Sequence, residues 1–292
     1  MSHIYPSDRL ETSFAPFREK MQAEGLSESA IRAFRGSYAA LLAGETGMIP
    51  EDTIQPAQDL PKADALTAPE SARASELLRQ TVLIKLNGGL GTGMGLEKAK
   101  SLLPVRGEDT FLDLIARQIL RLRAQTGGEV PVFMLMNSFS TSADTAAHLE
   151  ARFPQIGGRE VWELMQNKVP KVLASTLEPA PWPANPEQEW CPPGHGDIYA
   201  CLAGSGWLER LLASGVRYAF VSNSDNLGAT LDPAILAWFA DSGMPFAMEV
   251  TRRTESDKKG GHLAVRLRDG RFLLRESAQC PKDDEKHFQD IE

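Results

Sequence analysis

The sequence predicts an α/β protein with a mostly parallel sheet that is covered by helices on both faces. From about residue 66 onward, short apolar runs alternate with segments of helical period. The chain has 292 residues, 42% hydrophobic and 24% charged, which suffices for one large core or two smaller ones. We expect residues 1–65 to form a helical segment with a linker, and residues 66–292 to form the main domain.

The first 44 residues predict a pair of helices. Between residues 7 and 44, apolar side chains recur at three- and four-residue steps, for example at Leu10, Phe14 and Phe17. Ser27 gives only a weak capping signal, because Ala30 rather than an acidic residue stands three positions later. A stretch containing several prolines and aspartates follows, and it predicts a linker.

The main domain should alternate strands with helices. Strands are expected at 80–86, 131–136, 217–222, 246–251, 262–267 and 271–275, and helices at 110–125, 141–152, 205–214 and 232–241. The proline-rich segment 167–196 predicts a long ordered loop, a kind of segment that often carries function. In parallel sheets, ligands bind at the carboxyl ends of the strands, so residues at those ends are the candidates for a site.

A glycine-rich loop follows the first of these strands and reads LNGGLGTGMG from Leu86. Glycines expose backbone N–H groups that can cradle phosphate oxygens. The spacing contains no Gly-Lys-Ser/Thr, which excludes a P-loop. A dinucleotide fingerprint starting at Gly91 and Gly93 would need a third glycine where Leu96 stands, so a hydride-transferring enzyme is disfavoured.

Three lysines lie in or near this loop. Lys100 can neutralise phosphate charge as a phosphoryl group is transferred, whereas Lys98 is expected to point elsewhere. Lys85 lies inside the apolar strand, and we favour a structural role over phosphate binding.

Polar residues also follow other expected strands. Asp225 ends the run that starts at Phe220, where a carboxylate can hold Mg²⁺ against triphosphate oxygens, although a turn-capping role is an alternative. The amide of Gln166 offers a donor and an acceptor to a pyrimidine edge, and the alternative is an exposed residue without a role. His195 stands between two glycines, where a ligand can approach, or it is a lone turn histidine.

Composition excludes several classes of partner. The net charge of −8 and pI of about 5.3 argue against nucleic acid. No apolar run approaches the roughly 18–20 residues that span a membrane. The first residues show no basic segment followed by an apolar one, so we expect no signal peptide. Three distant cysteines show neither metal spacing nor a disulfide pattern, so we expect a cytoplasmic protein. The sequence carries no signal for an oligomeric state.

These motifs together resemble the eukaryotic-type UTP–glucose-1-phosphate uridylyltransferases. The matching segments are Leu86–Gly95 with Lys100-Ser101, Pro192–Asp197, and Asn223–Asn226. The resemblance implies a nucleotide-diphospho-sugar transferase fold of Rossmann-like type. It also implies Mg²⁺-assisted, in-line attack of glucose 1-phosphate on the α-phosphate of UTP, giving UDP-glucose and pyrophosphate.

The resemblance further implies a role for each candidate residue. UTP would contact Leu86, Asn87, Gly88, Gly89, Lys100, Gln166, Gly194 and Asp225. The sugar phosphate would contact Gly88, Gly89, His195 and Glu276. Lys100, His195 and Asp225 would take part in catalysis, and Asp225 would bind the Mg²⁺ ion.

The resemblance stops at the end of the chain, where the family continues into a sugar-binding strand and a C-terminal β-helical domain. We therefore expect a catalytic domain that is truncated at its C-terminal end. Two alternatives stay open: a UTP-binding fragment without catalysis, and a uridylyltransferase for another sugar 1-phosphate. A nucleotide-sugar-dependent glycosyltransferase would usually show Asp-x-Asp where this chain has Asn223-Ser224-Asp225, which counts against that class.

Overall fold

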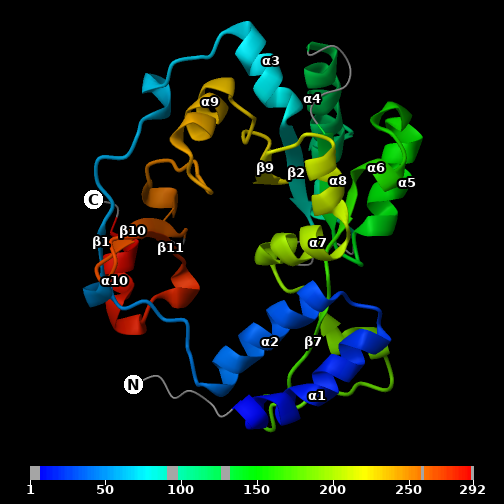
Figure 1. The fold of residues 1–292 in the computed structure, drawn as a ribbon, viewed down its shortest axis with the longest axis vertical. Helices are drawn as coiled ribbons and strands as arrows, with labels where there is room; N and C mark the ends of the chain where they lie inside the picture. The colour runs from blue at the N-terminus through cyan, green and yellow to red at the C-terminus, as the bar shows by residue number, and fades with distance from the viewer. Residues whose placement is uncertain (1–6, 91–97, 126–131, 258–259, 291–292) are drawn as a thin grey trace. The chain divides into compact units, whose positions relative to one another are not determined.

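The computed structural model describes residues 7–90, 98–125, 132–257 and 260–290 (Figure 1). It contains two compact units, which we describe separately. The larger unit comprises Met1–Ala43 and Ala68–Ala237, and the smaller comprises Gly44–Thr67 and Trp238–Glu292. The expected boundary between residues 65 and 66 stays a prediction.

A four-stranded parallel sheet forms the centre of the larger unit. Its strands are β2 (Thr81–Asn87), β5 (Val132–Asn137), β6 (Glu163–Met165) and β9 (Tyr218–Asn223), in the order β6-β5-β2-β9. The predicted strands at 80–86, 131–136 and 217–222 are confirmed to within one residue. The continuous apolar runs of β2 and β5 suit strands that are buried on both faces, whereas every second residue of the outer strand β9 is exposed.

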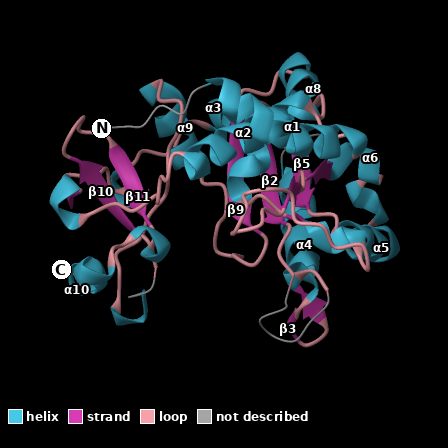
Figure 2. Ribbon diagram, turned by 90° about the horizontal axis from the view of Figure 1, so that it is seen from below, coloured by secondary structure: helices cyan, strands magenta, loops and turns pink. Residues whose placement is uncertain are grey.

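Helices cover both faces of this sheet, as expected. On one face, Leu83 and Phe133 pack with α4 (Phe111–Gln125) and α5 (Ser142–Arg152). On the other, Ile84 and Met134 pack with α7 (Ile198–Gly204) and α8 (Trp207–Ala213). Figure 2 shows the strands with α4 and α5 on one side and α8 on the other. The alternation of side chains along β2 explains this division, because successive residues point to opposite faces.

The predicted pair of N-terminal helices is confirmed as α1 (Ser7–Ala23) and α2 (Glu28–Leu42). Phe14, Phe17 and Tyr38 form the aromatic centre of their contact, to which Trp190 of the later loop adds. Ser27 does cap α2, because its Oγ accepts a 3.3 Å bond from the Ala30 N–H. The hydroxyl therefore satisfies one of the free N–H groups at this helix end without an acidic partner.

The predicted loop at 167–196 is largely irregular but contains a short antiparallel pair, β7 (Val169–Pro170) and β8 (Trp190–Cys191). Among the described residues of the larger unit, the sequence did not predict the helices α3 (Ser71–Arg79), α6 (Arg159–Trp162) and α7, nor the outer strand β6. A second short pair, β3 (Pro104–Arg106) and β4 (Asp109–Thr110), precedes α4. The helix α9 (Pro233–Ser242) begins in the larger unit and ends in the smaller.

The smaller unit contains an antiparallel sheet in the order β1-β10-β11. Its strands are β1 (Ile54–Pro56), β10 (His262–Arg266) and β11 (Phe272–Arg275), followed by α10 (Glu285–Gln289). The sequence predicted the last two strands, whereas β1 lies in the stretch that was read as a linker. Arg275 is fully buried and pairs with Glu51 and Asp284, so it ties the two stretches of this unit together.

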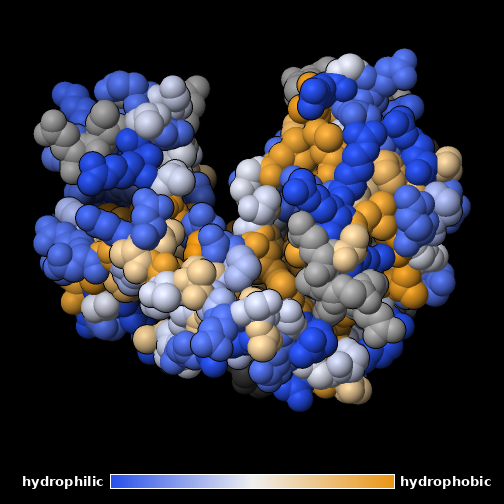
Figure 3. Space-filling view, turned by 90° about the horizontal axis from the view of Figure 1, so that it is seen from above, coloured by the Kyte–Doolittle hydropathy of each residue, from blue (hydrophilic) through white to orange (hydrophobic). Residues whose placement is uncertain are grey.

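The strand predicted at 246–251 is wrong, because these residues have no regular structure. Phe246, Met248 and Val250 alternate as in a half-buried strand, but their exposures are 62%, 48% and 44%. No described strand pairs with them, and an unpaired strand with an uncovered apolar face is not stable. Figure 3 shows one face of the molecule, on which orange hydrophobic residues lie among blue hydrophilic ones.

Within the described residues, no helix combines the length and the apolar character needed to cross a membrane.

Candidate active site

The carboxyl ends of the sheet strands bring the predicted site residues of the larger unit together. In the register of the sheet, Asn87 lies opposite Asn137, and Asn137 opposite Met165. Leu86 lies opposite Asn223, and its carbonyl accepts a 3.0 Å bond from the Ser224 N–H. Parallel strands in register therefore place the start of the glycine loop, Gln166 and the Asp225 turn at the same carboxyl end of the sheet, which we call the sheet edge below.

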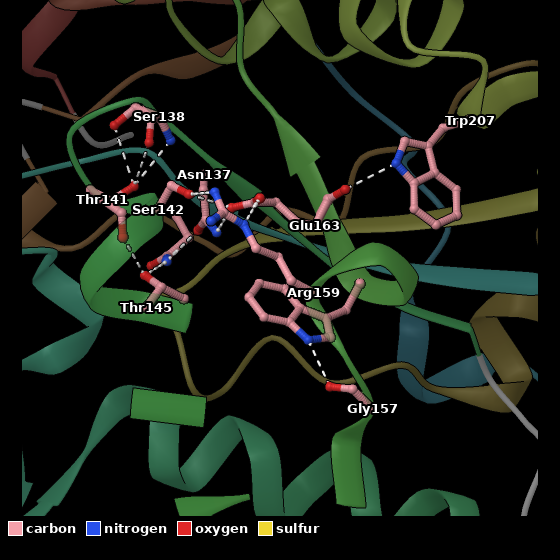
Figure 4. A network of polar contacts seen from close by, with 11 residues as sticks. Asn137, Ser138, Thr141, Ser142, Thr145, Gly157, Arg159, Glu163 and Trp207 are labelled. Carbon is pink, nitrogen blue, oxygen red and sulfur yellow. Dashed lines mark hydrogen bonds and ion pairs between the residues drawn. The ribbon is translucent and has the colours of Figure 1, made fainter. Parts of the chain in front are cut away.

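A buried network of polar side chains supports this edge. The Asn87 amide donates to Asn137 Oδ1 at 2.7 Å and to Thr145 Oγ1 at 3.0 Å. The Asn137 amide in turn donates to Glu163 at 2.9 Å, and Ser142 donates to the same carboxylate oxygen at 2.7 Å. Arg159 pairs with the other oxygen (Figure 4). Buried polar groups need such partners, so the network fixes the end of β2 in place.

Burial of Glu163 favours its neutral form, but hydrogen bonds from Arg159, Asn137 and Ser142 outweigh burial and lower its pKa. The side chain thus stays a carboxylate and a pure acceptor. Its backbone carbonyl also accepts a 2.9 Å bond from Trp207 Nε1 of α8 (Figure 4). Glu163 therefore connects the sheet edge to α5, α6 and α8.

The glycine loop begins at Gly88, directly after β2, and the chain comes back beside Gly89 at Lys100. Ser138 Oγ donates to the Gly88 carbonyl at 2.9 Å, and the Lys100 N–H donates to the Gly89 carbonyl at 3.1 Å. A bridge between Leu90 and Ala99 closes the base of the loop. Lys100 is thus held beside Gly89, and its role in phosphate binding stays a prediction. The remaining loop glycines, at 91, 93 and 95, lie outside the described residues.

Gln166 is 6% exposed and lies between the glycine loop and the turn at Gly194. Its backbone N–H donates to the Asn137 carbonyl at 2.7 Å, and its Nε2 donates to the Gly194 carbonyl at 2.9 Å. A Cβ at Gly88 would lie 2.6 Å from Gln166 Oε1, so only glycine leaves room for this amide. Gly194 has φ of 96°, a conformation that glycine adopts readily.

His195 and Asp225 are both exposed. His195 follows Gly194 and opens a short 3₁₀ helix, His195–Asp197, which leads into α7. Asp225 lies in the turn after β9 and can therefore reach a ligand at the sheet edge. Lys85, by contrast, is buried and donates to Ser222 at 2.7 Å and to the Ala229 carbonyl at 3.0 Å, which agrees with a structural role.

Glu276 belongs to the smaller unit. Its N–H donates to Gln279 Oε1 at 3.0 Å at the start of a 3₁₀ helix, and its carboxylate lies against Gly261. The side chain is exposed, and a role in sugar binding stays a prediction.

The described residues contain no group of three or more His, Cys, Asp or Glu side chains that could form a protein-only metal site. Asp225 is nevertheless a suitable ligand for Mg²⁺, because its exposed carboxylate supplies hard oxygen donors. Magnesium commonly uses one or two carboxylates together with substrate phosphates and water. The donor set therefore fits a metal that arrives with a nucleotide.

Two residues of this region were missed by sequence reasoning, namely Glu163 and Asp197. Each acts through contacts between segments that are distant in sequence, and neither belongs to a periodic pattern. Asp197 does lie in the Pro192–Asp197 motif, which could have drawn attention to it. A hollow of about 370 Å³ borders Gln166, and the turn joining α1 to α2 forms one of its walls.

A second hollow, of about 480 Å³, was also not predicted. It is lined by Arg159, Glu160, Glu163, Trp207 and Arg210. The guanidinium of Arg210 stacks on the Trp207 ring at 3.5 Å. Glu163 links this hollow to the candidate site, because it contacts Asn137 on one side and borders the hollow on the other.

Residues 31–292 match the protein family described as UTP--glucose-1-phosphate uridylyltransferase. The enzyme of that name from Solanum tuberosum is 39% identical over 272 residues, which cover 91% of this chain and 56% of the potato protein. The Saccharomyces cerevisiae enzyme is 43% identical over 215 residues, 73% of this chain and 42% of its own length. The chain thus spans about half the length of these curated relatives.

Solved structures give the same result. UDP-glucose pyrophosphorylase from Leishmania major aligns with a TM-score of 0.87 and 49% identity, covering 96% of this chain and 60% of that one. A mutant of the same enzyme in complex with UDP-glucose gives a TM-score of 0.88 at 49% identity. The Trypanosoma brucei protein described as UDP-glucose phosphorylase gives a TM-score of 0.88 at 50% identity, and the alignment covers 96% of this chain and 59% of that one. The nucleotide-diphospho-sugar transferase fold is therefore confirmed.

Proposed function

The chain belongs to the UTP–glucose-1-phosphate uridylyltransferase family, and from this premise we propose that it converts UTP and glucose 1-phosphate to UDP-glucose and pyrophosphate. The observation that carries the proposal is the edge of the sheet described above. There the Lys100 N–H donates to the Gly89 carbonyl, and both Asn87 and Gln166 donate to Asn137. Gln166 also donates to the Gly194 carbonyl. The solved relatives that bind UDP-glucose support the choice of substrate.

In the proposed reaction, a phosphate oxygen of glucose 1-phosphate attacks the α-phosphorus of UTP, and pyrophosphate leaves from the opposite side. The substrate supplies its own nucleophile, so positioning and charge stabilisation suffice. Backbone groups of Gly88 and Gly89 hold the phosphates, and Lys100 stabilises the charge that develops on them. His195 orients the sugar phosphate, and Gln166 with Gly194 holds the uracil. Glu276 accepts hydrogen bonds from the sugar hydroxyls.

Asp225 would hold Mg²⁺ in this proposal. The bound ion would supply positive charge to the triphosphate oxygens. The hydrogen bonds of Asn87 to Asn137 and Thr145 hold the end of β2 in place, so that the glycine loop that follows it meets the nucleotide in one arrangement. We propose UTP and glucose 1-phosphate as the partners. Nucleic acid is left out of the proposal because of the net charge of −8, and a membrane because no apolar run of the sequence is long enough to span one. We place the protein in the cytoplasm.

A second candidate is UTP binding without transfer. It is favoured by one observation, namely that the chain spans only 56% of the potato enzyme. In that case the nucleotide half of the site would function while the transfer step would not. Transfer to a different sugar 1-phosphate is a further variant of the main proposal.

The test is pyrophosphate release by the 292-residue chain with UTP, glucose 1-phosphate and Mg²⁺, against a control without the sugar phosphate. Release that depends on glucose 1-phosphate supports the proposal. UTP binding without release selects the second candidate, and absence of both refutes a uridine nucleotide function. Replacing glucose 1-phosphate by N-acetylglucosamine 1-phosphate or galactose 1-phosphate tests the sugar.

A further inference from the structure

The amide of Gln166 has only one orientation that satisfies its surroundings. Its Nε2 lies 2.9 Å from the Gly194 carbonyl oxygen, which can only accept a hydrogen bond. Its Oε1 occupies the space beside Gly88. Rotating the amide by half a turn would set Oε1 against the Gly194 oxygen and lose this bond. The Gly194 carbonyl therefore keeps Nε2 of Gln166 on its own side and Oε1 on the side of Gly88.

Asp197 holds together the two segments that make this contact. One carboxylate oxygen accepts a 2.8 Å bond from the Asn167 N–H, and the other accepts a 3.0 Å bond from the Asn167 side-chain amide. Asn167 directly follows Gln166, whereas Asp197 lies three residues after Gly194. Two bonds from one carboxylate thus bind the Gln166 segment to the Gly194 turn.

The surroundings of Asp197 show that this contact is built into the core. The side chain is buried, and it also accepts a 2.9 Å bond from the Cys201 thiol of α7. Burial raises the pKa of Cys201, and the bond to Asp197 raises it further, so the thiol stays protonated and remains a donor. The donors of Asn167 and Cys201 thus hold the Asp197 carboxylate in one position.

The orientation of Gln166 matters because uracil and cytosine present opposite patterns. Uracil offers a donor at N3 and an acceptor at O4, whereas cytosine offers an acceptor at N3 and a donor at its amino group. An amide with fixed ends can pair both groups of only one of these bases. Pairing with cytosine would require the half-turn that the Gly194 carbonyl opposes.

We propose that Asp197 is a positioning residue that locks the Gln166 amide through Asn167 and Gly194, and thereby sets selectivity for uracil over cytosine. The inference rests on the proposed function, because it assumes that Gln166 meets the base. Asp197 itself contacts neither substrate. Its effect should therefore appear in the choice of base more than in the handling of phosphates.

The experiment measures the affinities of UTP and CTP for the full chain by titration calorimetry with Mg²⁺. Both nucleotides carry the same triphosphate, so the ratio of their affinities isolates the base. For the wild type we expect a preference for UTP of roughly 10- to 100-fold, the range for one bidentate base contact. Asp197→Asn offers one acceptor oxygen in place of two, and we expect the ratio to fall at least about fivefold.

Two further variants provide matched tests. The double variant Asn167→Asp, Asp197→Asn interchanges the two side chains, so that the amide at position 197 donates to the carboxylate at position 167. We expect it to recover most of the preference for UTP. Cys201→Ala removes a donor to Asp197 but leaves both Asn167 bonds, so the preference should stay within about twofold of the wild type. If Asp197→Asn does not fold, as judged by its thermal transition, Asn167→Ala takes its place with the same expected loss.

The outcomes separate this inference from the proposed function. A wild type that prefers UTP, with a folded Asp197→Asn variant of equal preference, overturns the inference and leaves the proposed function intact. Equal affinity of the wild type for UTP and CTP also overturns it. A wild type that binds neither nucleotide refutes the proposed function, and the inference with it.

Discussion

Lys85 is a charged residue in the middle of a buried strand. Its side chain is 3% exposed, and burial lowers its pKa to about 8. Ser222 and the Ala229 carbonyl accept its hydrogen bonds, which permits an amine at this depth. The unfolded chain, by contrast, exposes the same amine with its ordinary pKa of 10.5. The two states therefore differ in protonation between these values.

This difference predicts how stability depends on pH. Between about pH 8 and 10.5 the unfolded chain binds a proton that the folded chain has released, so the free energy of unfolding should rise with pH in this window. Below pH 8 both states are protonated, and the contribution is constant. Urea unfolding of the wild type and Lys85→Met at pH 7.5 and 9.5 checks this. The prediction fails if both proteins show the same change.

Lys100 should matter for turnover more than for UTP affinity. Charge on the phosphates changes most during transfer, so Lys100→Ala should lower kcat by roughly 100-fold or more while UTP affinity falls far less. Lys98→Ala is the matched control, because it removes the same charge two residues away. Near-normal turnover of Lys100→Ala would falsify this role.

At the scale of elements, the network around Glu163 joins the ends of β2, β5 and β6 to α5. Glu163→Ala removes the acceptor of Asn137 and Ser142, and it leaves a buried amide unpaired. We expect a loss of about 1–3 kcal/mol in the free energy of unfolding, measured at neutral pH. Because the pKa of Glu163 is lowered in the folded state, this contribution is present above the unfolded pKa and disappears as pH falls through the folded one.

The control for this prediction is Glu160→Ala. Glu160 lies three residues earlier and is exposed, so its removal should change stability by less than about 0.5 kcal/mol. Equal losses for the two variants would show that the Glu163 network contributes nothing specific.

The elements themselves were predictable where the local pattern decides them. β2, β5 and β9 are apolar runs bounded by polar residues, and α4 and α5 have a clear helical period. The short α7 was missed because it follows a proline-rich loop without a period of its own. The strand predicted at 246–251 failed for another reason. Its alternation is real, but a strand also needs a neighbour, and sequence period contains no information about neighbours.

The candidate site shows the same limit. Glycines at strand ends and an amide near them can be found by eye in a sequence, and the structure does bring Gly88, Gln166 and Gly194 together. Asp197 and Glu163 could not be identified as site residues in that way. Their bonds cross 30 and 26 residues, respectively, and depend on sheet register.

At the scale of the whole molecule, the two compact units should lose structure independently. Arg275 is buried in the smaller unit, where Glu51 and Asp284 accept its hydrogen bonds. Arg275→Ala leaves these carboxylates without their cation, and we expect the smaller unit to lose about 2–4 kcal/mol. Hydrogen exchange followed by mass spectrometry should show faster exchange in peptides from 44–67 and 238–292 and no change in the sheet of the larger unit.

Arg271→Ala controls for the loss of positive charge, since Arg271 is exposed and lies directly before β11. It should leave exchange in both units unaltered. Faster exchange throughout the chain in Arg275→Ala would contradict independence of the units.

The strand order β6-β5-β2-β9 also has a consequence for the newly made chain. β2 leaves the ribosome before β5 and β6, and β9, its neighbour on the other side, comes last. The bond between Lys85 and Ser222 spans 137 residues, so one edge of β2 stays unpaired while most of the larger unit is synthesised. An open edge can recruit another chain. A nascent polypeptide stalled before residue 218 should therefore be the species most prone to aggregate and most dependent on chaperones.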